Sequence, residues 1–340
     1  MLLSPPSADS APSRHLDWAS NEPKIGALLV TYNPNMLELE TLLKRLLPQV
    51  DLAVLVDNGS ENVASLAQLK ETYSTSQDAP ITLILNEGNL GIAAAQNQGI
   101  EFLLAQGCDL VVLSDQDSVP EPDMVQKLYG CLVMAAAQAY SGKGAPVAAV
   151  GPVPVDARGD TASGEDVVDV SSALVYSFTK WGPKRRTIPS RQQSKDVPFV
   201  LASGSLIPAK VLRHVGPMNE SLFIDHVDLA WCMRAVSMGY RILVCGDAFL
   251  EHSLGEERAT LPGGRKVHVQ SPARNYYMVR NTLFLTRAPF MPWRWRVGYM
   301  SYLAKYVGFY TLAGIVQPSR WVALLEGTRD GLAGRGGARR

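Results

Sequence analysis

Residues 109–118 read DLVVLSDQDS, an apolar run that ends in two aspartates separated by one glutamine. The run has the length and the valine and leucine content of a strand that is buried on both faces. In an extended chain, residues two apart face the same side, so Asp115 and Asp117 can address one ligand together. A polar turn before a helix is the commoner explanation of such a pair, and the rest of the sequence has to decide between the two.

The same alternation of apolar runs and helical segments recurs upstream, from Lys24 onward. Short runs rich in Val, Leu and Ile lie at 25–32, 52–57 and 81–86. Between the runs lie stretches with apolar residues at helical spacing, at 36–49, 61–73 and 91–107. Strand and helix in regular succession predict βαβ units. We therefore predict an α/β fold with a mainly parallel, doubly wound sheet.

Polar, glycine-bearing segments follow the four expected strands. They read TYNP at 31–34, DNGS at 57–60, NEGNLG at 86–91 and DQDS at 115–118. Ligands of doubly wound sheets bind beyond the carboxyl ends of the strands, so we expect these segments to border one cleft. The first strand is not followed by G-x-G-x-x-G, which argues against an NAD-type dinucleotide site.

The composition indicates a globular enzyme of one or two domains. Of the 340 residues 46% are hydrophobic, and 32 basic side chains balance 32 acidic ones, so nothing in the charge favours a nucleic-acid partner. The four cysteines have no close pairing and no metal-finger spacing, which indicates reduced core residues and a cytoplasmic location. Residues 1–23 lack the pattern of a signal peptide, and we expect a disordered tail there.

Four segments, in this order and spacing, carry a resemblance to a known family. They are LLVTYNP (28–34), VLVDNGS (54–60), NEGNLGIAAAQNQGI (86–100) and LVVLSDQD (110–117). Together they resemble the nucleotide-binding half of the family 2 inverting glycosyltransferases, which have the GT-A fold.

The resemblance continues in the second half of the chain. FVLASGSLIP (199–208) and FIDHVDLAWCMRAVSMGYRI (223–242) extend it over about residues 24–255. The DQD and FID-x-VD-x-x-W variants, with YYMVRNTLFL (276–285), are similar to the bacterial rhamnosyltransferase branch, which builds cell-surface polysaccharide.

The resemblance implies a domain organisation and a set of ligands. Residues 24–118 would form the nucleotide-binding half and 119–255 the acceptor half, followed by a helical C-terminal region at 256–340. The donor would be a nucleotide sugar, typically dTDP-L-rhamnose in this branch, and the cofactor Mg²⁺ or Mn²⁺. The residues that would bind the nucleotide sugar are Thr31, Tyr32, Asn33, Asp57, Asn86, Gly91, Asp115 and Gln116.

Departure of a sugar from a nucleoside diphosphate builds negative charge on the phosphate, which a divalent cation can neutralise. By resemblance Asp115 would contact the ribose and Asp117 would coordinate the metal. His252, in FLEHSLG (249–255), matches a metal-binding histidine that family members often carry after the last core strand. A histidine ligand would favour Mn²⁺ over Mg²⁺.

Inversion at the anomeric carbon requires a base that takes the proton of the attacking hydroxyl. Asp225 and Asp228 are three apart, and the family pattern places the base on Asp228. Helix capping by the two aspartates is the alternative. Val227 and Ala230 stand where relatives commonly have acids, so the chain departs from the family pattern on the acceptor side. The residues assigned to the acceptor side are Gly204, Asp225, Trp231, Arg280 and Asn281.

Two further segments lie outside this pattern. Residues 156–196 mix Gly, Ser and charge, and we expect an insertion over the cleft in which GPKRR (182–186) forms a basic turn. Residues 293–316 carry aromatic side chains at helical spacing beside alternating Trp and Arg, as an interfacial helix does, although the same stripe could form a homodimer. Lys305 interrupts the run and argues against a membrane span.

We therefore predict a metal-dependent inverting glycosyltransferase that adds rhamnose to a hydroxyl of a surface glycan. Acceptors in this branch are often polyprenyl-linked, which would place the protein peripherally at the inner face of the cell membrane. The alternatives are a UDP-hexose donor with the same chemistry, or a sugar-nucleotide-binding protein without turnover. The presence of Asp115, Asp117 and Asp228 argues against the second.

Overall fold

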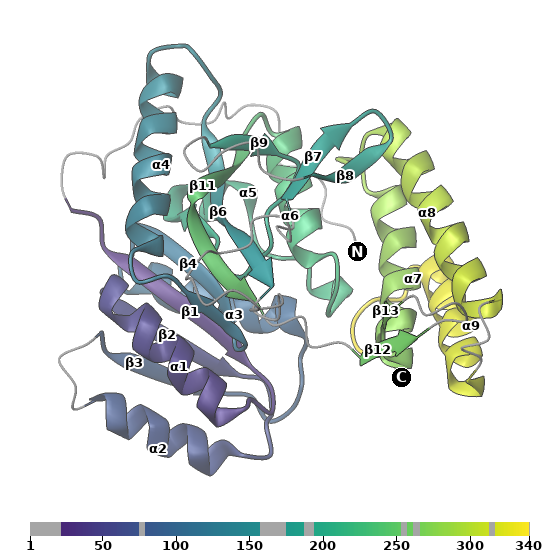
Figure 1. Ribbon diagram of the computed structural model, residues 1–340, viewed down its shortest axis with the longest axis horizontal. Helices are drawn as coiled ribbons and strands as arrows, with labels where there is room; N and C mark the ends of the chain where they lie inside the picture. Colours follow the sequence, from purple (N-terminus) through teal and green to yellow (C-terminus); the bar gives the residue numbers. More distant parts are fainter. Residues whose placement is uncertain are drawn as a thin grey trace.

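The computed structural model describes residues 22–74, 79–156, 175–186, 194–252, 257–260, 266–312 and 317–339 (Figure 1). Residues 1–21, most of the expected disordered tail, lie outside this part. In the first half of the chain strands alternate with helices, as the sequence predicts. The elements are β1 (Ile25–Thr31), α1 (Met36–Leu46), η1 (Leu47–Gln49), β2 (Leu52–Asp57), α2 (Val63–Ser74), β3 (Ile81–Leu85), α3 (Ile92–Ala105), β4 (Leu110–Asp115), β5 (Ser118–Pro120) and α4 (Met124–Tyr140).

The second half contains strands of 3 to 12 residues and the remaining helices. Its first elements are β6 (Val147–Asp156), β7 (Val175–Thr179), β8 (Gly182–Arg186), β9 (Lys195–Val197), β10 (Leu206–Pro208), α5 (Ala209–Val215), η3 (Glu220–Leu222), α6 (Val227–Ser237) and β11 (Arg241–His252). The remaining elements are β12 (Glu257–Thr260), β13 (Lys266–Val269), α7 (Pro272–Arg287), α8 (Trp293–Leu312) and α9 (Pro318–Ala333).

One large sheet joins the two halves, in the strand order β3-β2-β1-β4-β10-β6-β11-β5, with β9 paired to β11. The first four strands are parallel, as the alternation of strands and helices predicts, and the predicted α/β fold is confirmed. The short strand β10 runs antiparallel to both β4 and β6, whereas β6 and β11 are parallel again. The sheet is therefore mixed in its second half.

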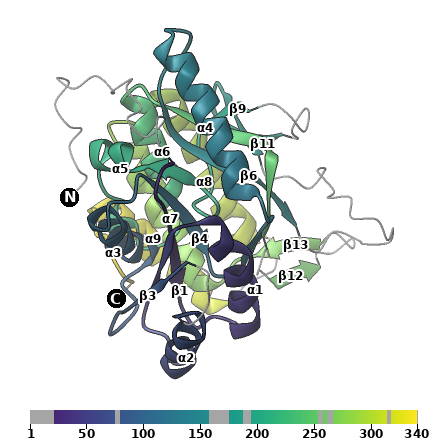
Figure 2. The same cartoon turned by 90° about the vertical axis from the view of Figure 1, so that its left-hand side faces the viewer.

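The sheet separates two hydrophobic cores, because successive strand residues point to opposite faces. In β1, Leu28 and Val30 pack with α3 and α6 on one face, and Ala27 and Leu29 pack with α1, α2 and α4 on the other. Figure 2 shows α3 and α5 on one side of β1 and β4, with α1 and α4 on the other. The apolar face that the sequence predicts for residues 36–49 is buried in α1 and at the start of η1: Leu39, Leu42, Leu43, Leu46 and Leu47.

The segment predicted to be an insertion contains a hairpin. Residues 182–186 form strand β8, antiparallel to β7, so the prediction of a basic turn is wrong. Gly182 has a φ of 138° and begins the second strand of the hairpin. The Gly-Pro pair favours a turn locally, but pairing with Val175–Thr179 extends the chain. Residues 157–174 and 187–193 of the expected insertion lie outside the described residues.

Helices α7, α8 and α9 pack together beside the sheet (Figure 1). Most of the aromatic stripe of α8 is internal, with Leu303 and Tyr310 buried against α7 and α9. Its exposed apolar side chains are instead Trp293, Val297, Met300 and Tyr302. Within the ranges described above, no helix combines the length and the hydropathy that a bilayer crossing requires.

Candidate active site

A cavity of about 850 Å³ lies where the end of β4, the start of α6, the β7–β8 hairpin and helices α7 and α8 meet. This volume is within the usual range for small-molecule sites. Four of the predicted residues line it together: Asp115, Asp117, Asp225 and Asp228. Residues more than 100 positions apart in the sequence are thus collected around one space.

Asp115, the last residue of β4, and the next residue, Gln116, are held by hydrogen bonds to neighbouring segments. The Asp115 backbone N–H donates to Ser203 Oγ at 3.2 Å, and Ser203 Oγ donates to the buried Ser118 Oγ at 2.7 Å. Gln116, between the two aspartates, accepts a 2.8 Å hydrogen bond from the Tyr32 N–H and donates to the Tyr32 carbonyl at 3.3 Å. The glutamine therefore ties the end of β4 to the end of β1.

Asp57 is buried at the end of β2, inside a network of hydrogen bonds. Its side chain is fully buried and accepts hydrogen bonds from Thr31 Oγ1 at 3.0 Å, from the Ser60 N–H at 2.9 Å and from Ser60 Oγ. Thr31 is buried as well. Neither residue has exposed surface with which to contact a nucleotide, so here they join the ends of β1 and β2. Asn33, in the same network, is exposed and accepts a bond from the Glu61 N–H at 2.8 Å.

The segment before α3 connects the nucleotide half to α6. Asn86 is partly exposed, and its side chain donates to Gln98 Oε1 at 2.9 Å. Gly91 has a φ of 87°, and a Cβ at this position would lie 2.6 Å from the ring of Phe223. The next N–H, of Ile92, donates to the Phe223 carbonyl at 2.7 Å. A glycine is required at position 91 both by its φ and by this close approach.

Asp228 lies in the first turn of α6, and its Oδ1 accepts a 2.7 Å hydrogen bond from the Leu229 N–H. Burial raises the pKa of this carboxyl to about 6, and the negative charges of Asp115 and Asp225 contribute to the rise. Asp225, by contrast, forms a 2.7 Å ion pair with Arg274. His226 is the N-cap residue of α6, so the alternative in which Asp225 caps the helix is not what the structure contains.

Residues 222–226, here named the α6 entry loop, have unusual backbone conformations. Phe223, Asp225 and His226 all have φ between 62° and 63°. At Phe223 the dihedrals (63°, −65°) and the 2.7 Å bond from the Ile224 N–H to the Leu222 carbonyl define a γ-turn. Such conformations cost free energy and persist only where surrounding contacts hold them, most often at functional sites.

Asn281 and Arg280 supply those contacts. The Asn281 side-chain amide donates to the carbonyls of Leu222, Ile224 and Asp225 at 2.7–3.0 Å. Both residues are fully buried, and neither lines the cavity. The prediction that they face the acceptor is therefore not supported: they hold the α6 entry loop from behind. A buried side chain facing backbone carbonyls cannot be told from a ligand-binding one by sequence.

The Arg280 guanidinium also links the segment before α6 to the residues that follow α9. It donates to the carbonyls of Ser221 and Leu222 at 2.9 Å, and to the Gly337 carbonyl. It lies over the ring of Tyr277, 4.8 Å from its centroid. The Gly337 N–H in turn donates to the Ser221 carbonyl at 2.9 Å. The residues after α9 are thus part of the support of the loop.

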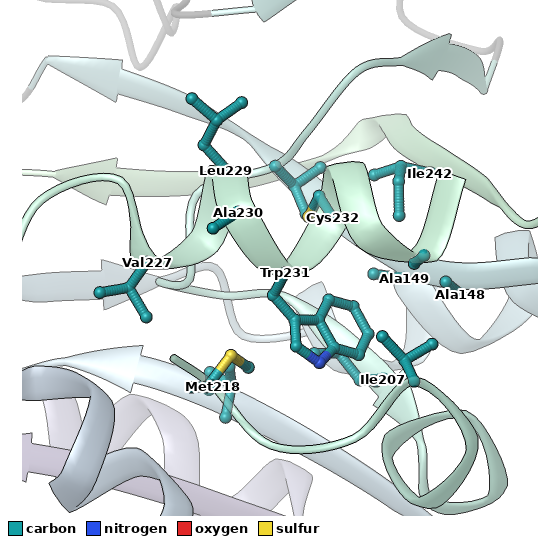
Figure 3. Close-up of a cluster of buried hydrophobic side chains, with 14 of the residues drawn as sticks. Ala148, Ala149, Ile207, Met218, Val227, Leu229, Ala230, Trp231, Cys232 and Ile242 are labelled. Atoms are coloured by element: carbon teal, nitrogen blue, oxygen red, sulfur yellow. The ribbon is translucent and has the colours of Figure 1, made fainter. Parts of the chain in front are cut away.

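Two other residues assigned to the acceptor side lie in the core. Trp231 is 2% exposed and packs among side chains that include Met218 and Ile207 (Figure 3). Its Nε1–H donates to the Gly216 carbonyl at 2.9 Å. Gly204 has a φ of 77°, and a Cβ there would lie 2.6 Å from Pro152. Both positions are explained by packing, and neither lines the cavity.

The two residues predicted to bind the metal, Asp117 and His252, lie on adjoining segments. Asp117 lines the cavity, and the backbone of His252 pairs with Ser118, the next residue after it. The side chain of His252 lies outside the described part of the structure. In the portion that the structure does describe, no three His, Cys, Asp or Glu side chains are grouped as a metal site.

Aromatic residues of the cavity were not predicted from the sequence. Tyr176 and Trp181 come from the β7–β8 hairpin, and Tyr299 and Tyr302 come from α8. The available signal was the aromatic stripe of residues 293–316, which we interpreted as a membrane or dimer surface. Nothing local indicates that part of this stripe faces a cavity.

Comparisons with known proteins show which family and which folds the chain is similar to. A family model described as "Glycosyl transferase family 2" matches residues 27–142. The chain is 30% identical over 275 residues to the dTDP-rhamnosyl transferase RfbF of Shigella flexneri, which covers 79% of this chain and 81% of RfbF.

Solved structures share the fold at low sequence identity. TarS residues 1–349 of S. aureus has a TM-score of 0.53 at 14% identity, with 91% of this chain and 80% of that chain covered. GalNAc-T7 with UDP, GalNAc and Mn²⁺ has a TM-score of 0.53 at 11% identity, with 91% and 62% covered. These similarities support a GT-A architecture.

Proposed function

Because the chain belongs to glycosyltransferase family 2, in its bacterial rhamnosyltransferase branch, we propose that it transfers L-rhamnose from dTDP-L-rhamnose to a glycan hydroxyl. Transfer would proceed with inversion and would depend on a divalent cation. RfbF, the relative that supports the donor assignment, is named as a dTDP-rhamnosyl transferase.

One observation carries this proposal. A single cavity is lined both by the two aspartates at the end of β4 and by Asp228 at the start of α6. The first position is where parallel sheets bind ligands, here the nucleotide sugar. The second supplies a carboxylate beside that ligand, as a displacement at the anomeric carbon requires.

Asp228 is suited to act as the base. With a pKa of about 6 it is mostly ionised at neutral pH, yet it binds a proton more strongly than an ordinary aspartate. Asp225 is held by Arg274, whereas among the described residues Asp228 has no cationic partner. The proposed role of Asp228 is to accept the proton of the acceptor hydroxyl as it attacks.

The cavity offers oxygen donors of the kind that Mg²⁺ and Mn²⁺ prefer. We propose Asp117 as the main protein ligand, with His252 as a second ligand from the neighbouring strand. Asp115 would contact the ribose, and the exposed Tyr32 and Asn33 would border the nucleotide. When bound, the cation would neutralise the charge that develops on the departing diphosphate.

We propose a polyprenyl-linked glycan as the acceptor, bound by a cytoplasmic protein that lies peripherally on the inner face of the membrane. In α8 the exposed Trp293, Val297 and Met300 follow one another at i, i+4 and i+7, beside the exposed Arg294. Cosedimentation with phosphatidylglycerol vesicles, reduced by Trp293→Ala, would support this orientation. A concentration-dependent dimer sensitive to the same substitution would instead assign this face to a homodimer.

The donor is tested by thermal unfolding with Mn²⁺ and a set of nucleotide sugars. A ligand that binds only the folded state raises the unfolding temperature, so dTDP-L-rhamnose should raise it more than UDP-glucose does. NMR analysis of the transferred sugar then checks that the anomeric configuration is inverted. Equal or reversed shifts would replace the donor by a UDP-hexose, and retention of configuration would exclude Asp228 as the base of a single displacement.

A further inference from the structure

The cavity has two chemically different parts. Aspartates occupy one, which the proposed function assigns to the donor, the cation and the base. The other part is an aromatic cluster that this assignment leaves without a ligand. The cluster consists of Tyr176, Trp181, Phe199, Tyr299 and Tyr302.

The rings of the aromatic cluster are available to a ligand. Trp181 is 49% exposed and Tyr302 47% exposed, although both line the cavity. The Trp181 ring contacts the ring of Trp293 edge-on, and the Tyr302 ring contacts that of Tyr306, yet about half of each side chain stays uncovered. Covering the remaining apolar surface is favourable. Half-exposed rings inside a cavity therefore present surface that a bound molecule can cover.

The aromatic cluster is also held in place before any ligand binds. Trp295 Nε1–H of α8 donates to the Thr179 carbonyl of the hairpin at 3.0 Å. A Cβ at Gly298 would lie 1.7 Å from the Trp181 carbonyl oxygen, so the hairpin rests directly on the helix at its glycine. Tyr176 stacks on Phe199 with ring centroids 4.8 Å apart. The cost of ordering these rings on binding is correspondingly small.

The aromatic cluster adjoins the proposed base. Tyr299 and Tyr302 line the same cavity as Asp228, and the Tyr299 ring centroid lies 6.1 Å from that of His226, two residues before Asp228. Burial raises the pKa of Tyr299, and the charges of Tyr176 and Asp228 add to the rise. Burial likewise raises the pKa of Tyr302, with Asp225 among the contributing charges. A molecule whose hydroxyl reaches Asp228 would therefore lie against these rings.

We propose that the aromatic cluster binds the pyranose ring of the acceptor sugar. The exposed rings of Trp181 and Tyr302 would pack against the sugar and so determine which acceptor binds. This inference rests on the proposed function. A pyranose has a C–H face that packs on an aromatic ring and hydroxyls at its edge that can reach the aspartates. A hydrocarbon chain would also cover the rings, but it would bury the neighbouring carboxylates against apolar groups, which is costly.

Binding of probe sugars tests the inference without requiring turnover. Saturation-transfer NMR would be recorded with methyl α-L-rhamnopyranoside and methyl N-acetyl-β-D-glucosaminide, in the presence of dTDP and Mn²⁺. The wild type should saturate the ring C–H protons of at least one probe. Trp181→Ala should weaken that binding about 10-fold, and Tyr302→Ala similarly, while Tyr302→Phe retains the ring and the affinity.

A matched control is Trp321→Ala, because Trp321 is 39% exposed on α9 and does not line the cavity. It should bind the probes and dTDP as the wild type does. Affinity for dTDP, measured by calorimetry, should be unchanged in Trp181→Ala, which also shows that this variant is folded.

The inference would be overturned if the wild type saturated neither probe sugar, or if Trp181→Ala saturated the probes as strongly as the wild type does. A loss of dTDP affinity in Trp181→Ala would also overturn it. So would a Trp181→Ala protein that binds farnesyl phosphate more weakly than the wild type but binds the glycosides equally well. The last would assign the aromatic cluster to a lipid chain. The proposed function fails by a different measurement, namely if the wild type releases no dTDP from dTDP-L-rhamnose. The two failures are therefore distinguishable.

Discussion

Replacing Asp228 by Asn should abolish sugar transfer and, at the same time, stabilise the folded protein above about pH 6. The isosteric amide can still accept the hydrogen bond from the Leu229 N–H, but it carries no charge that burial penalises. A carboxylate that only capped α6 would behave in the opposite way, because its loss would leave the chemistry intact and cost about 1 kcal/mol of stability.

The size of the gain follows from the pKa. Burial, with the nearby negative charges, raises the pKa of the Asp228 carboxyl from 3.8 to about 6. At about 1.4 kcal/mol per unit the full shift is worth roughly 3 kcal/mol, and we expect about 1–3 kcal/mol because the side chain is partly exposed. For a chain of this size this raises the unfolding temperature by about 2–6 °C.

The pH dependence has a definite sign. Asp228 is protonated in both states below about pH 4, so the variant and the wild type should then be equally stable. Between about pH 4 and pH 6 the unfolded chain ionises first, the wild type loses stability, and the advantage of the variant grows to its full value.

Thermal unfolding at about pH 8 and about pH 5, together with transfer assays, checks both parts. Loss of a general base lowers the rate by about 10²–10⁴. Asp123→Asn is the matched control, since Asp123 is the exposed N-cap residue of α4 and is paired with Lys127 at 2.9 Å. It should keep full transfer. An Asp228→Asn protein that is less stable and keeps more than about a tenth of the transfer would refute the reasoning and make Asp225 the next candidate.

Four further outcomes are expected. Transfer by the wild type should rise with pH through about 6, as Asp228 ionises, and a pH profile that is flat from about pH 5 to pH 8 would contradict this. EDTA should abolish transfer and Asp117→Asn should lower kcat by orders of magnitude with unchanged circular dichroism, whereas full activity in EDTA would end the metal proposal. Asn281→Ala leaves the carbonyls of Ile224 and Asp225 without the donor that Asn281 supplies, so chemical denaturation should show a loss of about 2–4 kcal/mol and kcat should fall; an unchanged kcat would mean that the α6 entry loop needs no support. Gly91→Ala should destabilise the protein by about 1–3 kcal/mol, while Gly88→Ala, whose Cβ would meet nothing within 4 Å, should be neutral in the same melts.

The parallel half of the fold could be predicted from the sequence because its signals are local. Apolar runs and helical spacing within about 30 residues define β1 to β4 and their helices, and the rule for parallel sheets then places Asp115 and Asp117 at a ligand site. Strand β10 could not be predicted in this way. It has three residues, and its antiparallel pairing with Val111 and Val112 depends on a partner almost 100 positions away.

Side-chain roles were harder to predict than positions. Asp228 was identified by a family pattern, and the structure places it in the cavity, but the same pattern assigned Arg280 and Asn281 to the acceptor side. Whether a polar side chain meets a ligand or a backbone carbonyl is decided by residues about 57 positions away, such as Leu222 and Ile224. The same difficulty applies to Trp231, an aromatic residue that the sequence assigned to the acceptor side but that is buried in the core.

The contact between Arg280 and Gly337 has a consequence for how the enzyme is made. The loop that precedes the proposed base is finished only by residues that follow α9. A chain still being synthesised can fold its N-terminal sheet early, since domains form as they leave the ribosome. The α6 entry loop, however, gains its full support only once residues up to Gly337 have been synthesised. A polypeptide that has not yet reached Gly337 would therefore be able to hold donor without consuming it.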